Sequence, residues 1–166
     1  LYMILVGLFC VIGLLSYSAG PYPLSRYGLG DFLVVLFYGY VPVFFSTYLI
    51  TGLNVFSDSF MLCVTFLVST SIALPSDNIL ILNNYRDFDT GRADGKNTLV
   101  VRIGRQASLV FYCVNGIVAV LCAVVSIAVI AIYAESGMAG MLLSLLPLLY
   151  LIPHLRTFRD IRLSPF

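Results

Sequence analysis

Charged side chains are scarce in this 166-residue chain: they make up 10% of it, while 60% of the residues are hydrophobic. Soluble domains carry about 25% charged and 45–50% apolar residues, so this composition excludes an ordinary soluble domain. A net charge of +1 leaves no basic face for a nucleic-acid partner. The four cysteines have no C-x-x-C spacing, and the single histidine, His154, has no partner in ligand spacing. Neither a disulfide framework nor a zinc site is indicated.

Long apolar runs account for most of the chain. A transmembrane helix needs about 20 mostly apolar residues. Five stretches come close to that length: residues 1–18, 32–50, 59–82, 107–133 and 138–153. Nothing indicates strands, because a membrane barrel would need alternating segments of about ten residues. The sequence therefore predicts an all-α membrane protein, a multi-helix transmembrane bundle in a lipid bilayer.

Lys and Arg residues occur in three places: at Arg26, in the segment 86–105 and in the segment 156–162. The alternate connections, 51–58 and 134–137, contain none. This alternation matches the positive-inside rule and predicts that the basic loops face the cytoplasm. Because the chain starts at a leucine and stops inside a basic segment, we expect residues 1–166 to be a single transmembrane domain truncated at both ends.

The segment 83–98 gathers eleven polar or charged side chains between two of the predicted spans. Carboxylates, guanidinium groups and an amine beside a bilayer are suited to binding a diphosphate through Mg²⁺. Asn83, Asp87 and Gly91 are four residues apart, so they share one face if the third span continues as a helix into this segment. Asp87 is the best candidate for a Mg²⁺ ligand, and Asn83, one helical turn earlier, can add a carbonyl oxygen. The candidate substrate-binding side chains in this segment are Asn83, Asn84, Arg86, Arg92 and Lys96. Its cations can stabilise a departing diphosphate.

Other polar residues lie outside that segment. Tyr22 and Arg26, four residues apart before the second span, are candidate catalytic residues that can contact a cation and a phosphate. Asp77 and Asn78 lie within the third span, where polar side chains usually face a cavity or a partner. Asn78 is a candidate substrate-binding residue, with interhelical hydrogen bonding as an equal alternative for both. Asn115 in the fourth span is expected to bond between helices.

These motifs resemble those of the UbiA-type superfamily of intramembrane prenyltransferases, most closely its menaquinone branch, the 1,4-dihydroxy-2-naphthoate polyprenyltransferases. The second Asp-rich motif of that branch is similar to N-N-x-R-D-x-x-x-D-R-x-x-G-K-x-T-L-x-V-R-x-G, which residues 83–104 follow in register. The matching residues are Asn83, Asn84, Arg86, Asp87, Arg92, Gly95, Lys96, Thr98, Leu99, Val101, Arg102 and Gly104. Tyr22 and Arg26 match the family's Y-x-x-x-K/R motif.

The resemblance implies a bundle of nine transmembrane helices around a cavity, of which this chain covers roughly the fourth to the eighth. It implies an enzyme of the bacterial cytoplasmic membrane, a prenyltransferase with Mg²⁺ as cofactor. The substrates would be a polyprenyl diphosphate and 1,4-dihydroxy-2-naphthoate. Ionisation would give an allylic cation, which the electron-rich ring attacks with loss of its carboxylate and a proton. The polyprenyl tail would run along the apolar spans near the aromatic residues of segment 32–48.

Two departures from the family pattern leave alternatives open. Gly91 stands where the family has the second Asp of the motif, and Asp89 or Asp94 can replace that Asp as a metal ligand. The family's other Asp-rich motif is not in this sequence, which we attribute to truncation. The alternatives are another UbiA-type branch with a ubiquinone, haem O, homogentisate or phospholipid acceptor, a transporter with a polar pathway, and a scaffold without catalysis, which Gly91 would explain.

Overall fold

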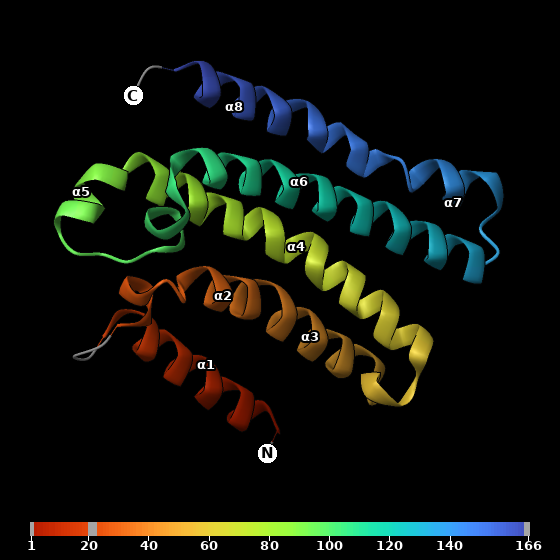
Figure 1. Cartoon of the computed structure of the whole chain (residues 1–166). Coiled ribbons are helices and arrows are strands. Elements are labelled where there is room, and N and C mark those ends of the chain that lie inside the picture. Colours follow the sequence, from red (N-terminus) through yellow and green to blue (C-terminus); the bar gives the residue numbers. More distant parts are fainter. Residues whose placement is uncertain (1, 20–22, 165–166) are drawn as a thin grey trace.

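The computed structural model describes residues 2–19 and 23–164, which form long helices lying side by side (Figure 1). In chain order the elements are α1 (Tyr2–Ser18), the 3₁₀ turn η1 (Leu24–Tyr27), α2 (Gly30–Val34), the π-helical segment η2 (Val35–Tyr40), α3 (Val41–Thr51), η3 (Val55–Ser57), α4 (Ser59–Arg86), α5 (Phe88–Ala93), α6 (Leu99–Tyr133), α7 (Gly137–Leu143), η4 (Leu146–Tyr150) and α8 (Leu151–Leu163). The described residues include no strand, which confirms the predicted all-α class.

Four helical stretches are long and apolar enough to cross a membrane: Gly30–Thr51, Ser59–Arg86, Leu99–Tyr133 and Gly137–Leu163. They confirm four of the five predicted spans. The remaining helix, α1, is apolar but has 17 residues. At 1.5 Å per residue that is about 26 Å, slightly less than a hydrocarbon core of about 30 Å. The four spans extend beyond the predicted apolar runs into polar residues at their ends. In α6 this extension includes a kink at Gly104, which has φ 83° and ψ 164°.

The central helix is α4, which packs against α6 on one side and against η2 and α3 on the other. Its buried positions include Thr65, Ser69, Ala73, Asp77, Ile81 and Tyr85, one every four residues. That spacing places them along one stripe of the helix. Several are small, and small residues let helix backbones approach closely in a membrane protein. At Gly39 of η2, an added Cβ would lie 2.3 Å from the Cβ of Ala73.

The outer helices α1 and α8 pack against the bundle through aromatic rings that lie on glycines. In η2, the Phe37 ring covers Gly13 of α1, where an added Cβ would lie 2.2 Å from a ring carbon. In α8, His154 lies against Gly116 of α6 in the same way. The His154 ring also stacks on Tyr112 with a centroid distance of 4.5 Å. Its Nε2 lies 3.2 Å from the carbonyl oxygen of Cys113, within hydrogen-bond distance. These contacts tie α1 and α8 to the centre of the bundle.

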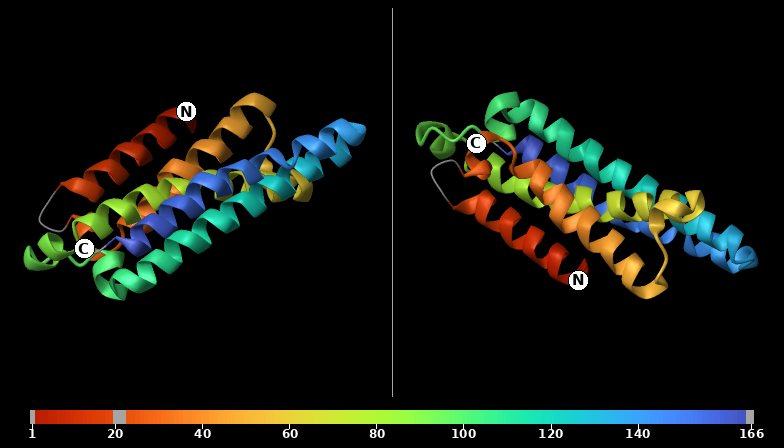
Figure 2. Two further views of the ribbon diagram at one scale, coloured as in Figure 1. Left: turned by 90° about the horizontal axis from the view of Figure 1, so that it is seen from above. Right: turned by 90° about the horizontal axis from the view of Figure 1, so that it is seen from below.

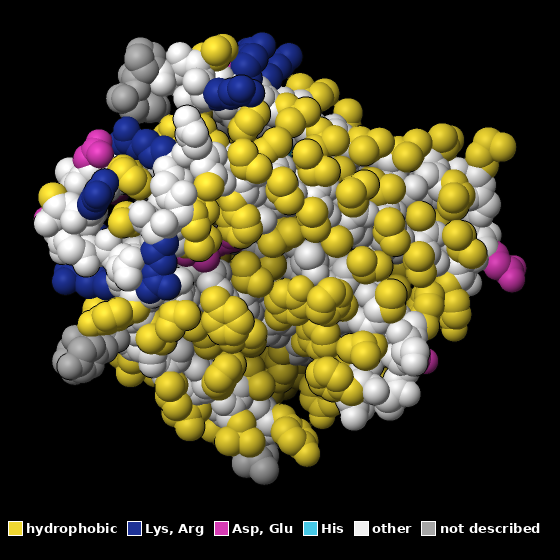
Figure 3. All heavy atoms as spheres, in the orientation of Figure 1, with side chains coloured by type: hydrophobic (Ala, Val, Ile, Leu, Met, Phe, Trp, Pro, Cys, Tyr) yellow, Lys and Arg dark blue, Asp and Glu magenta, His cyan; other side chains and the backbone are white. Residues whose placement is uncertain are grey.

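The surface divides into apolar helix faces and one basic end. Large hydrophobic side chains are exposed along every span, and they cover the middle of the molecule in Figure 3. Lys and Arg side chains gather in that view at the end where α5 lies. We call this the basic end: it comprises η1, α5, the start of α6 and the final turns of α8. Figure 2 shows that the opposite end carries the α3–α4 and α6–α7 connections.

Candidate functional site

The polar segment after α4 is a short helix set at an angle to the span. Helix α4 ends at Arg86, and Asp87 has the non-helical angles φ −92° and ψ 20° before α5 begins. The amide of Gly91 still donates to the carbonyl of Asp87 at 2.8 Å. Asn83 and Asp87 are exposed, whereas Gly91 is buried. The expectation that these three positions share one helical face is therefore wrong, because the chain turns at Asp87.

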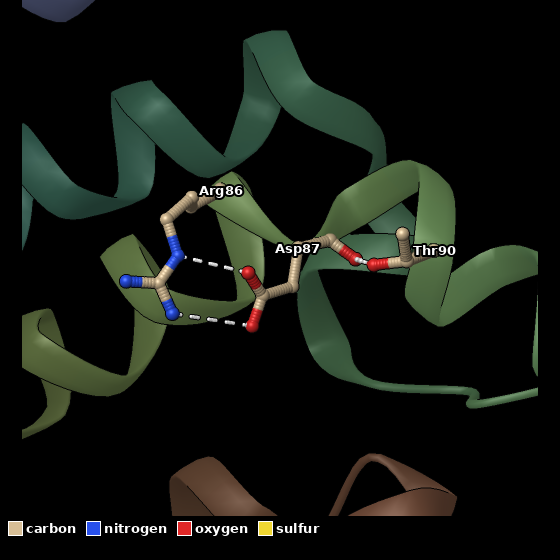
Figure 4. A network of polar contacts seen from close by, with 3 residues as sticks. All are labelled: Arg86, Asp87 and Thr90. Atoms are coloured by element: carbon tan, nitrogen blue, oxygen red, sulfur yellow. Dashed lines mark hydrogen bonds and ion pairs between the residues drawn. The ribbon is translucent and has the colours of Figure 1, made fainter.

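The Asp87 carboxylate faces the Arg86 guanidinium, as Figure 4 shows, with Nε donating to Oδ1 at 2.8 Å and Nη2 donating to Oδ2 at 3.3 Å. The Thr90 hydroxyl donates to the backbone carbonyl of Asp87 at 3.1 Å and steadies the turn. Hydrogen bonding to Arg86 holds the pKa of Asp87 below its ordinary value, and the charges of Arg86 and Lys96 lower it further. Asp87 is therefore a carboxylate at neutral pH.

The other two candidate metal ligands differ in their surroundings. Asp89 is paired with Arg105, whose Nη2 lies 2.9 Å from Asp89 Oδ2. The Arg105 guanidinium also lies over the Phe88 ring, 5.0 Å from its centroid. Asp94 is exposed at the end of α5. In residues 2–19 and 23–164, no three His, Cys, Asp or Glu side chains gather as a metal site would require.

Mg²⁺ does not need such a cluster when it binds together with phosphates, because it usually takes one or two protein carboxylates and leaves its other positions to phosphate and water. Asp87 fits that requirement as an ionised, exposed carboxylate. Asp89, like Asp87, is paired with an arginine, and Asp94 is a third exposed carboxylate at this end.

The loop before α2 docks onto the loop after α5. The amide of Asn97 donates to the carbonyl of Arg26 at 2.8 Å, and Nη2 of Arg102 donates to the carbonyl of Tyr27 at 2.5 Å. The approach requires glycine at position 28, which has φ +75° and where a Cβ would lie 2.8 Å from the Asn97 carbonyl oxygen. These contacts bring the two predicted motifs together, although Tyr22 of the first motif lies outside the described residues.

Between these loops lies a cavity of about 170 Å³, which we call the basic-end cavity. Its lining residues are Tyr17, Ser25, Arg26, Gly30, Asp31, Leu80, Asn84, Lys96 and Thr98. Three of the predicted site residues are therefore brought together, namely Arg26, Asn84 and Lys96. The predicted residues Asn83, Arg86 and Arg92 are exposed at the same end and do not line it.

Sequence reasoning missed Asp31, Ser25 and Thr98 as lining residues. The signal for Asp31 was present, because it is a carboxylate in the first turn of an apolar span, where an acidic side chain usually faces a cavity or a partner. Ser25 and Thr98 gave no such signal: both are small polar residues in loops, and Thr98 also caps α6 by accepting from the amide of Val101 at 3.3 Å.

Polar side chains continue from this cavity into the bundle. Asn115 Nδ2 donates to Asp77 Oδ2 at 3.1 Å, which confirms the predicted interhelical hydrogen bond. The carboxyl groups of Asp77 and Asp31 interact electrostatically and through a side-chain hydrogen bond. Asn78 is buried, and neither its oxygen nor its nitrogen has a hydrogen-bond partner. Asp31 Oδ1 likewise lacks one.

A second, apolar hollow lies towards the opposite end of the molecule, between α1 and α3. We call it the aromatic groove; its volume is about 400 Å³. Its lining residues are Leu5, Val6, Phe9, Val41, Phe44, Phe45, Tyr48, Asn54, Val55 and Phe56. The Phe44 and Phe56 rings stack across it with a centroid distance of 5.6 Å.

Comparison with known proteins relates the chain to one family of enzymes. The profile of the UbiA prenyltransferase family matches residues 1–164. The 1,4-dihydroxy-2-naphthoate octaprenyltransferase of Escherichia coli (strain K12) is 36% identical over 103 residues, which cover 62% of this chain and 31% of that protein. The enzymes with the same name from Haemophilus influenzae and Mycobacterium tuberculosis are 32% identical over 117 residues and 31% identical over 119 residues.

The last two matches cover 70% and 72% of this chain and 36% and 38% of the relatives. The chain thus spans about a third of the length of the curated relatives that it matches. No solved structure matches it.

Proposed function

The chain belongs to the UbiA prenyltransferase family, and from this premise we propose that its parent protein transfers a polyprenyl group from an allylic diphosphate to 1,4-dihydroxy-2-naphthoate. The observation that carries the proposal is the meeting of two motifs distant in sequence. Arg26, from the loop before α2, and Lys96, from the loop after α5, line one cavity together with Asn84. An anionic substrate at this end of the bundle would meet cations from both sides.

Arg26 and Lys96 would bind phosphate oxygens and stabilise the negative charge that develops on the diphosphate as its bond to the allylic carbon breaks. Arg86 and Arg92 lie exposed at the same end and would attract the substrate to it. Asn84 would orient the diphosphate by hydrogen bonding. The apolar spans would keep water from the cation that forms.

Asp87 is the residue that would hold Mg²⁺ beside the diphosphate, with Asn83, one turn earlier, as a second oxygen donor. The bound metal would neutralise charge on the leaving diphosphate. Arg86 keeps Asp87 ionised, and Mg²⁺ prefers an ionised carboxylate.

The aromatic groove supports a polyprenyl chain as the transferred group. Its lining is almost entirely apolar and includes Phe44, Phe45 and Tyr48 of α3. From Tyr17 at the basic-end cavity, α1 runs to Phe9 at the groove, a rise of about 12 Å at 1.5 Å per residue. A substrate with its diphosphate at the basic end and its tail in the groove would lie along α1 and α3.

The test uses bacterial membranes that contain the full-length parent protein, supplied with 1,4-dihydroxy-2-naphthoate and farnesyl diphosphate. We expect a prenylated naphthoquinol to form with Mg²⁺ and not with EDTA. Asp87→Asn should lower the rate by at least about 100-fold, because it removes the metal-binding charge. Asp160→Asn is the matched control: Asp160 also pairs with the arginine before it, at 3.1 Å, but lies on α8 outside the motif.

Native activity in the control variant together with loss in Asp87→Asn would support the proposal. Equal activity in the native protein and Asp87→Asn would refute the role of Asp87. No product with any aromatic acceptor, from a protein that is folded and inserted, would refute the transferase function and favour a scaffold in which Gly91 has replaced a needed carboxylate.

A further inference from the structure

The basic-end cavity is chemically two-sided. Arg26 and Lys96 supply positive charge from its two loops, whereas Asp31 of α2 supplies a carboxyl group. Asp31 is 8% exposed. Its side chain hydrogen-bonds to that of Asp77, and its Oδ1 has no other partner. Buried polar atoms are nearly always hydrogen-bonded, so an unpartnered carboxyl oxygen that lines a cavity indicates a ligand with a hydrogen-bond donor.

The residues behind Asp31 in the bundle are also polar and buried. Asp77 is 2% exposed and is held by Asn115 from α6, and its carboxyl group is in electrostatic contact with Asp31. Asp77 Oδ1 also has no hydrogen-bond partner. Burying a carboxyl group in a membrane span is costly, so such groups usually have a function. The three residues of this polar cluster come from α2, α4 and α6.

The diphosphate by itself leaves Asp31 unexplained. An ionised diphosphate has only acceptor oxygens, so it would bind Arg26 and Lys96 but be repelled by a carboxylate. A hydroxyl group on the ring of an aromatic acceptor supplies the donor for Asp31, and Arg26 and Lys96 are then left for the phosphate oxygens.

The size of the cavity also fits an aromatic ring. Its volume is about 170 Å³, and an engineered apolar cavity of about 150 Å³ binds benzene. Tyr17 and Leu80 form its apolar wall beside Gly30, where an added Cβ would lie 3.6 Å from a carbon of each, an ordinary contact. The apolar wall and the Asp31 carboxyl group together define a slot for a flat, hydroxylated ring.

We propose that the basic-end cavity receives the ring of the aromatic acceptor and that Asp31 accepts the hydrogen bond of a ring hydroxyl group. This inference rests on the proposed prenyl transfer and adds a residue that recognises the acceptor rather than the diphosphate. Asp31 thereby selects hydroxylated rings and fixes the orientation in which the ring meets the allylic carbon.

The test is a binding measurement on the full-length parent protein in lipid nanodiscs. The probes are 1,4-dihydroxy-2-naphthoate and 2-naphthoate, which keeps the ring and the carboxylate but lacks both hydroxyl groups. The native protein should bind the dihydroxy compound roughly 10- to 100-fold more tightly, the range for one hydrogen bond to a charged group. Asp31→Asn should lose most of that preference, whereas the control Asp160→Asn should keep it.

Binding of farnesyl diphosphate with Mg²⁺, measured on the same samples, separates this inference from the proposed function. We expect Asp31→Asn to keep it. If the native protein binds the diphosphate and binds the two naphthoates with equal affinity, the role of Asp31 is overturned. The proposed prenyl transfer would still stand. A native protein that binds neither kind of ligand would overturn both proposals.

A second variant covers the case in which Asp31→Asn fails to fold. Asp31→Glu keeps a carboxyl group and should retain the preference for the dihydroxy compound. If both variants lose naphthoate and diphosphate binding together, Asp31 has a structural role and the inference is wrong. If Asp31→Asn instead changes only the Mg²⁺ concentration needed for diphosphate binding, Asp31 belongs to the metal site and the inference is equally wrong.

Discussion

At position 91 this chain has a glycine where the resembled motif has an aspartate, and the surroundings of that glycine show that a side chain would fit there. Gly91 is buried beneath the side chain of Lys96, and an added Cβ would lie 3.8 Å from Lys96 Cδ, an ordinary contact. The amide of Lys96 also donates to the carbonyl of Gly91 at 2.9 Å. A side chain therefore fits at this position, and the glycine is not required by the backbone.

Restoring the acidic side chain should strengthen metal binding. We expect Gly91→Asp to fold like the native protein and to lower, several-fold, the Mg²⁺ concentration that gives half-maximal prenyl transfer, because a second carboxylate can join Asp87. The matched control is Gly91→Asn, which has the same shape without the charge. The measurement is a Mg²⁺ titration of activity in the full-length parent. An identical titration curve for the Asp and Asn variants would contradict the expectation.

Among the elements, α4 decides how closely the other helices can pack. Its buried stripe of Thr65, Ser69, Ala73 and Asp77 alternates small with polar side chains. Without a hydrophobic driving force between helices in lipid, association depends on close packing and on hydrogen bonds such as that of Asp77 with Asn115. Gly39 in η2 meets this stripe most tightly, and η2 leads directly back to α2, which carries Asp31.

A methyl group at Gly39 should therefore destabilise the bundle. In Gly39→Ala the new Cβ would lie 2.3 Å from Ala73 Cβ and 3.0 Å from the Ser69 carbonyl oxygen, so the two helices must separate. Overpacking of this kind costs about 1–3 kcal/mol. Gly7→Ala in α1 is the control, since a Cβ there meets nothing within 4 Å. Thermal unfolding in detergent should show a lowered Tm only for Gly39→Ala. A Tm equal to that of Gly7→Ala would refute the tight contact.

The whole molecule is polarised along its length. The basic end collects both motifs, the basic-end cavity and the arginines of α8, whereas the opposite end carries Asp58 and Glu135 and the aromatic groove. All connections with basic residues thus lie on one side of the apolar middle, as Figure 3 illustrates for one face. By the positive-inside rule we expect that side to face the cytoplasm.

This orientation can be checked by cysteine labelling in intact cells, in a parent whose native cysteines are replaced by alanine. We expect Glu135→Cys, at the opposite end, to react with a membrane-impermeant maleimide from outside. Asp94→Cys, at the basic end, should react only after the cells are permeabilised. Each variant is the control for the other, because both positions are exposed. Labelling of Asp94→Cys in intact cells would reverse the proposed orientation.

The sequence by itself determined the class of the molecule, most of its spans and the two motifs. Hydropathy predicts a span from local composition alone, and residues 83–104 carry their pattern in consecutive positions. It also predicted that Asn115 hydrogen-bonds to another helix, because a lone amide within a span has few other uses. It placed Asn83, Asp87 and Gly91 on one face, because periodicity assumes that a helix continues, and it could not foresee the turn at Asp87.

Only the tertiary structure decided which polar side chains share a cavity. The docking of Arg26 and Tyr27 onto Asn97 and Arg102 joins segments about seventy residues apart, and no local pattern encodes such a contact. That docking brings Asp31 and Lys96 into the lining of one cavity. The physical reason is that a cavity is created by the packing of several helices, whereas hydropathy and motif spacing describe one helix at a time.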